Sequence, residues 1–249
     1  MARITEIAPD IFQITEHVAE INLQFNHFLV RDDESLLFHT GYKRMFPLMH
    51  ESVSKLIDPA RLRYVSFSHF ESDECGALNE WLGVAPQAEV IAGFVGAMIN
   101  LQDFAIRAPR AVTADESIST GKYHFRFVST AQVPHGWDAG VLFEETQRTL
   151  FCSDLLHQWG DCEPFTSDSV MDRTREAMRL TQAGPLANYV PYNAHTERVL
   201  EGLAKMQPRT LAAMHGSTYI GDGAQALREL AVIMREELGE MAVPKGAAR

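Results

Sequence analysis

The segment from Ser68 to Gly76, which reads SHFESDECG, carries an imidazole and two carboxylates at alternate positions: His69, Glu71 and Asp73. It lies between an apolar stretch typical of a strand and an apolar stretch typical of a helix. A loop at the end of a strand has no ladder hydrogen bonds to hold its side chains apart, so these three can surround one cation. Taken alone, the pattern is also common in solvated turns, and its meaning depends on ligands elsewhere in the chain.

Three further residues with metal-ligating side chains, His135, Asp154 and His215, each follow a stretch that reads as an apolar strand. Open α/β sheets gather their ligand sites at the carboxyl ends of strands, so we expect all six side chains to converge on one rim. Three histidines and three carboxylates are enough to hold two metal ions, with one carboxylate bridging them. The remaining seven histidines lack this placement and are predicted to be surface or core residues.

Six residues in this order and spacing, His69-x-Glu71-x-Asp73 followed by His135, Asp154 and His215, resemble the di-iron motif of flavodiiron proteins, which have the metallo-β-lactamase fold. The local segments SHFESDECGALNEW, VPHGWDAGVLF, LFCSDLL and AAMHGS are also similar to that family, and the resemblance covers nearly the whole chain. It implies that His69, Glu71 and His135 hold one iron. It further implies that Asp73 and His215 hold the other, and that Asp154 bridges the two.

Two departures from the flavodiiron pattern affect the predicted chemistry. The family usually carries a histidine where this chain has Glu74, so Glu74 is either an extra carboxylate ligand or turned away, leaving the second iron more open. Flavodiiron enzymes also continue into a flavodoxin-like domain that binds FMN, whereas this sequence ends at Arg249. We therefore expect two iron ions joined by an oxo or hydroxo bridge, and no FMN within this chain.

The resemblance implies an oxygen-binding di-iron protein, that is, a non-haem protein that binds or senses O2. Reduction of O2 or of nitric oxide would require an external flavoprotein or a rubredoxin-like electron donor, so the residues leave open whether the protein is an enzyme. A signalling protein and a second copy of the chain, forming a homodimer, are further candidate partners.

The main alternative within the same fold is a dinuclear zinc hydrolase of the thioesterase or lactonase type. Such enzymes resemble H-x-H-x-D-H at this segment, and here Glu71 and Glu74 stand where they have histidines. Carboxylates are harder ligands than imidazole and suit iron or manganese better than zinc, which favours iron. A lactamase-like scaffold that binds only a partner, without metal, is a third hypothesis.

Several aromatic residues and one histidine are candidates for a layer around the centre: Phe70, Trp137, His157, Trp159 and Tyr192. Such residues can exclude water and shape a small apolar pocket for O2, whereas packing in the core is the alternative role for each. Tyr192 and His157 have polar tips that can also donate a hydrogen bond.

The elements that must position these residues follow from the residue patterns. Strand-like segments fill the first forty residues, and strands and helices alternate from about residue 42, with a helix over 76–82. A second β-rich stretch follows, with strands over 122–133 and 141–152. Helices are predicted over 167–182 and 195–206, and Asp222 caps a last helix. Two β-plus-α halves predict a four-layer αββα metallo-β-lactamase-like sandwich of the α+β class. We expect one domain over residues 1–240 and a loose tail over 241–249.

Composition agrees with a compact protein. A hydrophobic fraction of 46% over 249 residues supplies a large core, and a net charge of -11 argues against non-specific nucleic-acid binding. We find no secretory signal and no apolar stretch long enough for a membrane span, so we expect a soluble, cytoplasmic protein without membrane contact. The three cysteines, Cys75, Cys152 and Cys162, form no C-x-x-C pair and are predicted to be buried thiols.

Overall fold

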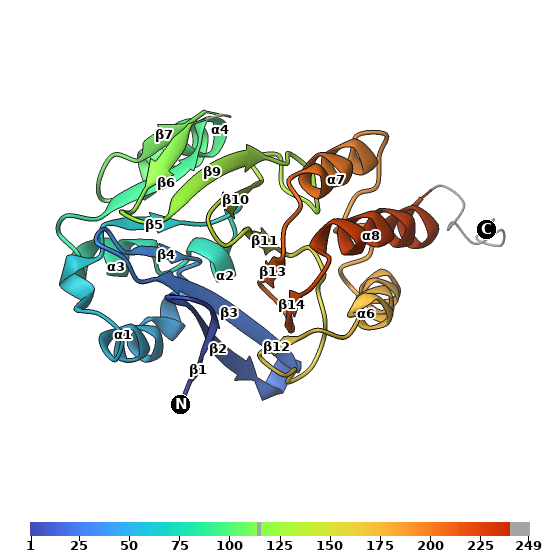
Figure 1. Cartoon of the computed structure of the whole chain (residues 1–249), viewed down its shortest axis with the longest axis horizontal. Helices are drawn as coiled ribbons and strands as arrows, with labels where there is room; N and C mark the ends of the chain where they lie inside the picture. Colours follow the sequence, from blue (N-terminus) through green and yellow to red (C-terminus); the bar gives the residue numbers. More distant parts are fainter. Residues whose placement is uncertain (114–115, 240–249) are drawn as a thin grey trace.

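The computed structural model describes residues 1–113 and 116–239, and the predicted tail over 241–249 lies outside this part of the chain. Two seven-stranded sheets follow one another along the sequence, each covered by helices (Figure 1). Both sheets mix parallel and antiparallel pairs. The predicted α+β class and sandwich architecture are therefore confirmed.

The first sheet contains β1 (Arg3–Ala8), β2 (Ile11–Val18), β3 (Leu23–Val30), β4 (Leu36–Phe38), β5 (Tyr64–Ser66), β6 (Glu89–Gly93) and β7 (Arg110–Val112). Its strands lie in sequence order, β1-β2-β3-β4-β5-β6-β7. Pairing is antiparallel from β1 to β4 and parallel from β4 to β7. The change coincides with the first helical connection, because parallel neighbours need a crossover.

The second sheet contains β8 (Ser117–Ser119), β9 (His124–Ser129), β10 (Gly140–Glu144), β11 (Thr149–Ser153), β12 (Phe165–Thr166), β13 (Thr210–Ala213) and β14 (Thr218–Ile220). The strand order is β12-β14-β13-β11-β10-β9-β8. β11 and β13 are parallel neighbours, with Phe151 opposite Ala212. Two chain segments far apart in sequence therefore leave the sheet at the same edge.

Helices cover the outer face of each sheet. The first half has α1 (Phe46–Ser54), α2 (Ser72–Cys75), α3 (Leu78–Val84), α4 (Phe94–Gly96) and α5 (Gln102–Phe104), with short helical turns η1 (Ala19–Ile21), η2 (Lys43–Met45), η3 (Pro59–Arg61) and η4 (Ala97–Leu101). The second half has α6 (Met171–Ala183), α7 (Thr196–Lys205) and α8 (Gly223–Leu238). The α6 and α7 helices both contact α8 (Figure 1).

Three apolar cores separate the four layers. The central core lies between the sheets and includes Phe28 and Phe151, whose ring centroids are 5.5 Å apart. Leu29, next to Phe28 on β3, belongs instead to the core beneath α1 and α3, because successive side chains of a strand point to opposite faces. A third core joins the second sheet to α6, α7 and α8, with Leu227 among its fully buried members.

Two predicted boundaries are wrong in ways that affect the site. The strand predicted to reach Val133 ends at Ser129, because Gln132 has a left-handed φ of 65° and Pro134 lacks a backbone N–H to pair. The helix predicted over 76–82 begins two residues later, as α3, and a separate short helix that was not predicted, α2, ends just before Gly76, where a Cβ would lie 2.2 Å from the Ser72 carbonyl oxygen. The first change lengthens the loop that carries His135, and the second places Asp73 on a short helix.

Two other predictions, the cap of the last helix and the buried cysteines, agree with the structure. The Asp222 side chain caps α8 by accepting a hydrogen bond from the Gln225 backbone N–H at 2.9 Å. All three cysteines are free and buried. Among the described residues, no helix combines the length and apolar character that crossing a membrane requires.

Candidate metal centre

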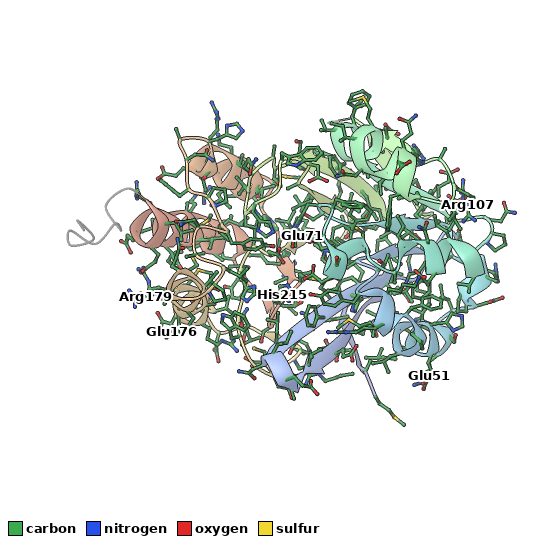
Figure 2. All side chains as sticks on the ribbon, turned by 180° about the vertical axis from the view of Figure 1, so that it is seen from behind. Glu51, Glu71, Arg107, Glu176, Arg179 and His215 are labelled. Carbon is green, nitrogen blue, oxygen red and sulfur yellow. The ribbon has the colours of Figure 1, made fainter. Side chains whose placement is uncertain are left out.

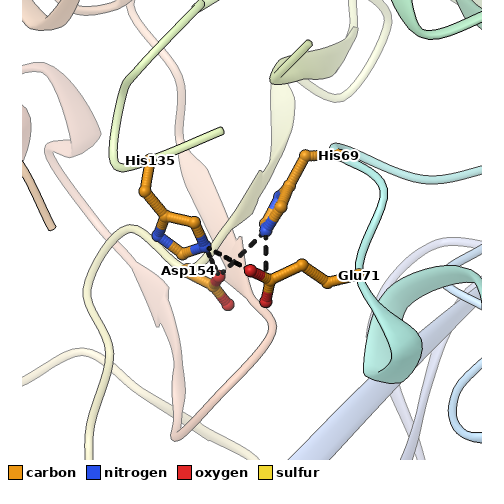
Figure 3. A group of neighbouring side chains, drawn as sticks. All are labelled: His69, Glu71, His135 and Asp154. Atoms are coloured by element: carbon orange, nitrogen blue, oxygen red, sulfur yellow. Dashed lines mark ion pairs between the residues drawn. The ribbon is translucent and has the colours of Figure 1, made fainter. Parts of the chain in front are cut away.

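Four of the predicted ligands form a tight group at the strand ends (Figure 3). His69, Glu71, His135 and Asp154 each offer one ligand atom, and these atoms lie within 4.8 Å of one another. The Nε2 atom of His135 is 3.5 Å from Glu71 Oε1 and 3.3 Å from Asp154 Oδ2. His69 Nε2 is 3.5 Å from Glu71 Oε2. Two imidazole nitrogens and two carboxylates therefore face one small space.

The other two predicted ligands lie on the far side of Asp154. His215 Nε2 is 3.4 Å from Asp73 Oδ2 and 3.3 Å from Asp154 Oδ1. Asp154 thus presents Oδ1 to His215 and Oδ2 to His135. The structure brings all six predicted residues together, and the Asp154 carboxylate lies between His69, Glu71 and His135 on one side and Asp73 and His215 on the other.

The elements explain this convergence. His69 and Glu71 lie in the loop after β5, and Asp73 lies on α2, so the first half supplies three of the six residues. Asp154 directly follows β11 and His215 lies just beyond β13, so their parallel pairing places them side by side. Gly136, with a φ of 82°, brings the loop of His135 close to His69, because a Cβ there would lie 3.2 Å from the His69 Cβ.

Unsatisfied polar atoms indicate that the group is built for a cation. His69 Nε2, His135 Nε2 and Asp154 Oδ1 are buried and have no hydrogen-bond partner. Such atoms are rare in folded proteins because desolvation without a partner is costly. The Nδ1 atom of His215 lies 2.7 Å from the carbonyl oxygen of Gln24, which fixes the proton on Nδ1 and leaves Nε2 as a lone-pair donor.

The charges of the group agree with this interpretation. Burial by itself lowers the pKa of His215, but Asp154 and Asp73 raise that pKa to about 10. Burial likewise opposes charge on His69, whereas Glu74, Asp154 and Glu71 raise its pKa to about 10. Carboxylates strong enough to hold protons on buried imidazoles would equally attract metal ions. The donor set therefore fits a metal centre.

The Glu74 carboxylate is turned away from both sets of candidate ligands, the one around His135 and the one around His215. Its side chain is 1% exposed, and Oε2 accepts hydrogen bonds from the backbone N–H groups of Ser68 at 2.7 Å and His69 at 2.9 Å. Oε1 accepts from the Ser153 hydroxyl and lies 3.3 Å from His69 Nδ1. Of the two alternatives for Glu74, the geometry fits a carboxylate that supports the loop and orients His69 from behind.

Two of the five predicted surrounding residues pack beside His215. The ring of His157 lies 4.8 Å from that of His215 and 5.1 Å from that of Trp159, measured between centroids. Nε2 of His157 and Nε1 of Trp159 are buried without a hydrogen-bond partner. Both residues line the same cavity as His215.

The other three predicted surrounding residues contribute less. Phe70 packs its ring 5.1 Å from that of Phe104, and Trp137 is 45% exposed at the rim of a surface pocket. Tyr192 donates its hydroxyl to Glu197 at 2.5 Å and does not line the pockets around the centre. The structure therefore places Tyr192 away from the candidate centre.

Tyr189 lies beside the candidate centre, where Tyr192 was predicted to lie. Its hydroxyl donates to Glu71 Oε2 at 2.5 Å, and its ring centroid is 4.1 Å from that of His135. The residue lies in an irregular loop between α6 and α7, where no periodicity indicates which side chain points inward. The sequence shows two tyrosines three residues apart, and it does not indicate which of them faces the centre.

A four-layer αββα sandwich with six metal-ligating residues at its strand ends defines a metallo-β-lactamase-like protein with a candidate metal centre. The family model described as "ODP family beta lactamase" matches residues 23–216, and the chain belongs to that family. All six candidate ligands fall within the matched range.

Curated relatives that match the chain are longer proteins. The rubredoxin-oxygen oxidoreductase of Megalodesulfovibrio gigas is 24% identical over 200 residues, which cover 79% of this chain and 49% of the relative. A putative diflavin flavoprotein A 2 of Nostoc sp. is 26% identical over 136 residues, covering 53% of this chain and 23% of the relative. The chain spans about half the length of the first relative and less of the second.

Solved structures show the same fold. A fragment of the putative diflavin flavoprotein A 5 from Nostoc sp. superposes with a TM-score of 0.79 at 15% identity, covering 95% of this chain and 97% of that one. Rubredoxin oxygen:oxidoreductase from Desulfovibrio gigas superposes with a TM-score of 0.76 at 18% identity. The superposition covers 92% of this chain and 61% of that one. The predicted resemblance to the flavodiiron core is therefore confirmed.

Proposed function

We propose that the protein holds two iron ions at this centre and binds or senses O2 there, with reduction of O2 or nitric oxide when an external donor supplies electrons. The observation that carries the proposal is the position of Asp154 between His135 and His215. Its Oδ2 atom faces His135 and its Oδ1 atom faces His215. His69, Glu71 and His135 would hold one ion, Asp73 and His215 the other. Bound iron would supply the reversible electron transfer that these reactions require.

The residues of the chain itself prepare the site in three ways. Glu74 and the carbonyl oxygen of Gln24 orient His69 and His215 through their Nδ1 atoms. Tyr189 holds the Glu71 carboxylate by a hydrogen bond and covers His135 with its ring, which limits the access of water. Among the described residues, Asp73, Asp154 and His215 make up the second group, and Glu74 faces inward instead of adding a fourth ligand. That arrangement supports an open position for a small molecule.

The donor set also supports iron over zinc. Three carboxylates among six ligand residues make the site hard, and hard oxygen ligands suit iron and manganese better than zinc. The names of the relatives include a rubredoxin-oxygen oxidoreductase and flavoproteins, which supports a rubredoxin-like or flavin-containing donor as the partner. A homodimer, and a single domain over residues 1–240, remain part of this proposal.

Metal analysis followed by oxygen mixing tests the proposal. Protein from iron-replete cells should contain about two irons per chain and no FMN. We expect the reduced protein to react with O2 once per iron pair, and sustained O2 consumption with an added electron donor would indicate a reductase instead of a sensor. Two zinc ions together with esterase or lactonase turnover would overturn the iron proposal.

A further inference from the structure

A cavity of about 480 Å³ lies beside the centre, between α6, α8 and the turn after β11. Five of the six candidate ligands form one part of its wall: Glu71, Asp73, His135, Asp154 and His215. Most of the remaining wall is aliphatic, with Leu23, Leu155, Met178, Leu230, Met234 and Leu238 among the lining residues. The cavity is thus polar where it meets the candidate metal centre and mainly apolar elsewhere, with Thr181 and Gln182 of α6 as polar members of that part of the wall.

The volume is far larger than a diatomic gas requires. A water molecule, which is of similar size, takes about 30 Å³ in the liquid. Pockets for small organic ligands typically measure about 300–1,000 Å³, and protein interiors rarely leave voids larger than one water. A cavity of about 480 Å³ therefore matches an organic ligand and exceeds what binding O2 alone explains.

The α6 helix separates its charged and apolar faces around this cavity. Glu176 and Arg179 lie on the outer side of α6, away from Glu71 and His215 (Figure 2). Ala177, Met178 and Thr181 of the same helix line the cavity. Among the described residues, the lining includes no lysine or arginine. A ligand would find no partner for a charge on the part of it that lies along α6 and α8.

Polar groups are concentrated near His215. His157 and Trp159 line the cavity there, and each has a buried ring nitrogen without a hydrogen-bond partner. We propose that the cavity binds a mainly aliphatic organic molecule with a single polar end, which lies toward His157, Trp159 and the candidate centre. The uncharged body of the molecule lies between α6 and α8. Binding of such an organic molecule goes beyond the proposed binding of O2.

Straight-chain alcohols are suitable probes because they have one polar end and an adjustable apolar body. Hexanol, octanol and decanol are titrated into the purified full-length protein by calorimetry. We expect one equivalent to bind, with affinity rising about threefold to fourfold for each added methylene, since burying a methylene contributes about 0.8 kcal/mol. Octanediol, with a hydroxyl at each end, should bind several-fold more weakly than octanol, because its second hydroxyl would lie in the mainly aliphatic part of the cavity.

Adjacent substitutions on α6 test the location. Thr181→Trp fills the cavity and should weaken decanol binding at least tenfold. Leu180→Trp adds the same ring at a position that is 52% exposed and does not line the cavity, so decanol affinity should change less than twofold. Circular dichroism and melting curves establish that both variants are folded.

Several outcomes would overturn the inference: no binding, affinity independent of chain length, equal binding of octanol and octanediol, or equal effects of the two tryptophan variants. Iron content and O2 reactivity are measured on the same preparation. Iron-containing protein that reacts with O2 but binds no alcohol would overturn this inference and leave the proposed function intact. Alcohol binding by protein that holds no iron would support this inference and overturn the proposed function.

Discussion

Asp154 is the residue on which a two-metal centre depends, because its two carboxylate oxygens face different histidines. We predict that Asp154→Ala removes both metal ions together, whereas loss of a terminal ligand would weaken one site more than the other. Metal content per chain after gel filtration is the measurement. Asp161→Ala is the matched control, because the side chain of Asp161 is 56% exposed and its ion pair within the described part of the chain is with Arg3. Selective loss of one ion from Asp154→Ala would show terminal ligation.

The sequence predicted all six residues that converge, because each stands just after an apolar segment and strand ends share one edge. It left Glu74 undecided. Asp73 and Glu74 are consecutive on α2, and successive helical side chains point about 100° apart, so one reaches the centre while the other faces the interior. Neighbouring residues of similar chemistry cannot be separated without knowing where such a short helix begins. Tyr189 and Tyr192 pose the same problem in a loop.

Ion pairs between α6 and α8 provide a test at the scale of elements. Glu237 of α8 accepts hydrogen bonds from Arg179 at 2.8 Å and Arg175 at 2.6 Å, both on α6. These arginines lower the pKa of Glu237 below its ordinary value of 4.5. A lowered carboxyl pKa contributes stability that is present above about pH 4.5 and is lost as the pH falls through the folded-state pKa.

We therefore predict that Glu237→Gln lowers the free energy of unfolding at pH 7 by about 0.5–1 kcal/mol, a modest value because water screens the pair. The difference from the unsubstituted protein should shrink as the pH falls below 4.5, where the carboxylate takes up a proton. Urea unfolding at a series of pH values measures this difference in the free energy of unfolding. Glu176→Gln, an exposed α6 residue without an ion pair among the described residues, should show neither effect. A difference that grows toward low pH would contradict this argument.

Helices were easier to predict than strands. The segments predicted over 167–182 and 195–206 are α6 and α7 with small shifts, because an amphipathic helix shows its period within its own sequence. The strands β12 and β14 have two and three residues and were not predicted. Their pairing joins Phe165 to Thr218, far apart in the chain, and no local pattern reports such a partner. Short strands of this kind depend on tertiary contacts.

The core between the two sheets tests the molecule as a whole. Phe151 is fully buried, and its ring centroid lies 5.5 Å from that of Phe28 and 5.4 Å from that of Phe38 in the opposite sheet. We predict that Phe151→Ala destabilises the protein by about 3–5 kcal/mol, the usual cost of removing a buried aromatic ring. Phe165→Ala, at a position that is 47% exposed, should change stability by less than about 0.5 kcal/mol.

Unfolding is followed by far-ultraviolet and near-ultraviolet circular dichroism together. Because the aromatic core is shared by both sheets, the two signals should change in one transition for the unsubstituted protein and for Phe151→Ala alike. Two separate transitions would mean that the sheets are stable independently. The alternation of strand-rich and helical segments predicted the layers, but which phenylalanines meet between the sheets depends on register and could not be read from the sequence.

The division of the ligands between the two halves has a thermodynamic consequence. His69, Glu71 and Asp73 come from the half that forms the first sheet, whereas His135, Asp154 and His215 come from the half that forms the second. Metal ions bound there would act as a crosslink between the sheets, so occupancy and sheet docking would be linked equilibria. At a free metal concentration of about 100 times Kd, such linkage adds about 2.7 kcal/mol to the free energy of unfolding. Conversely, any force that loosens one sheet from the other would release the metal.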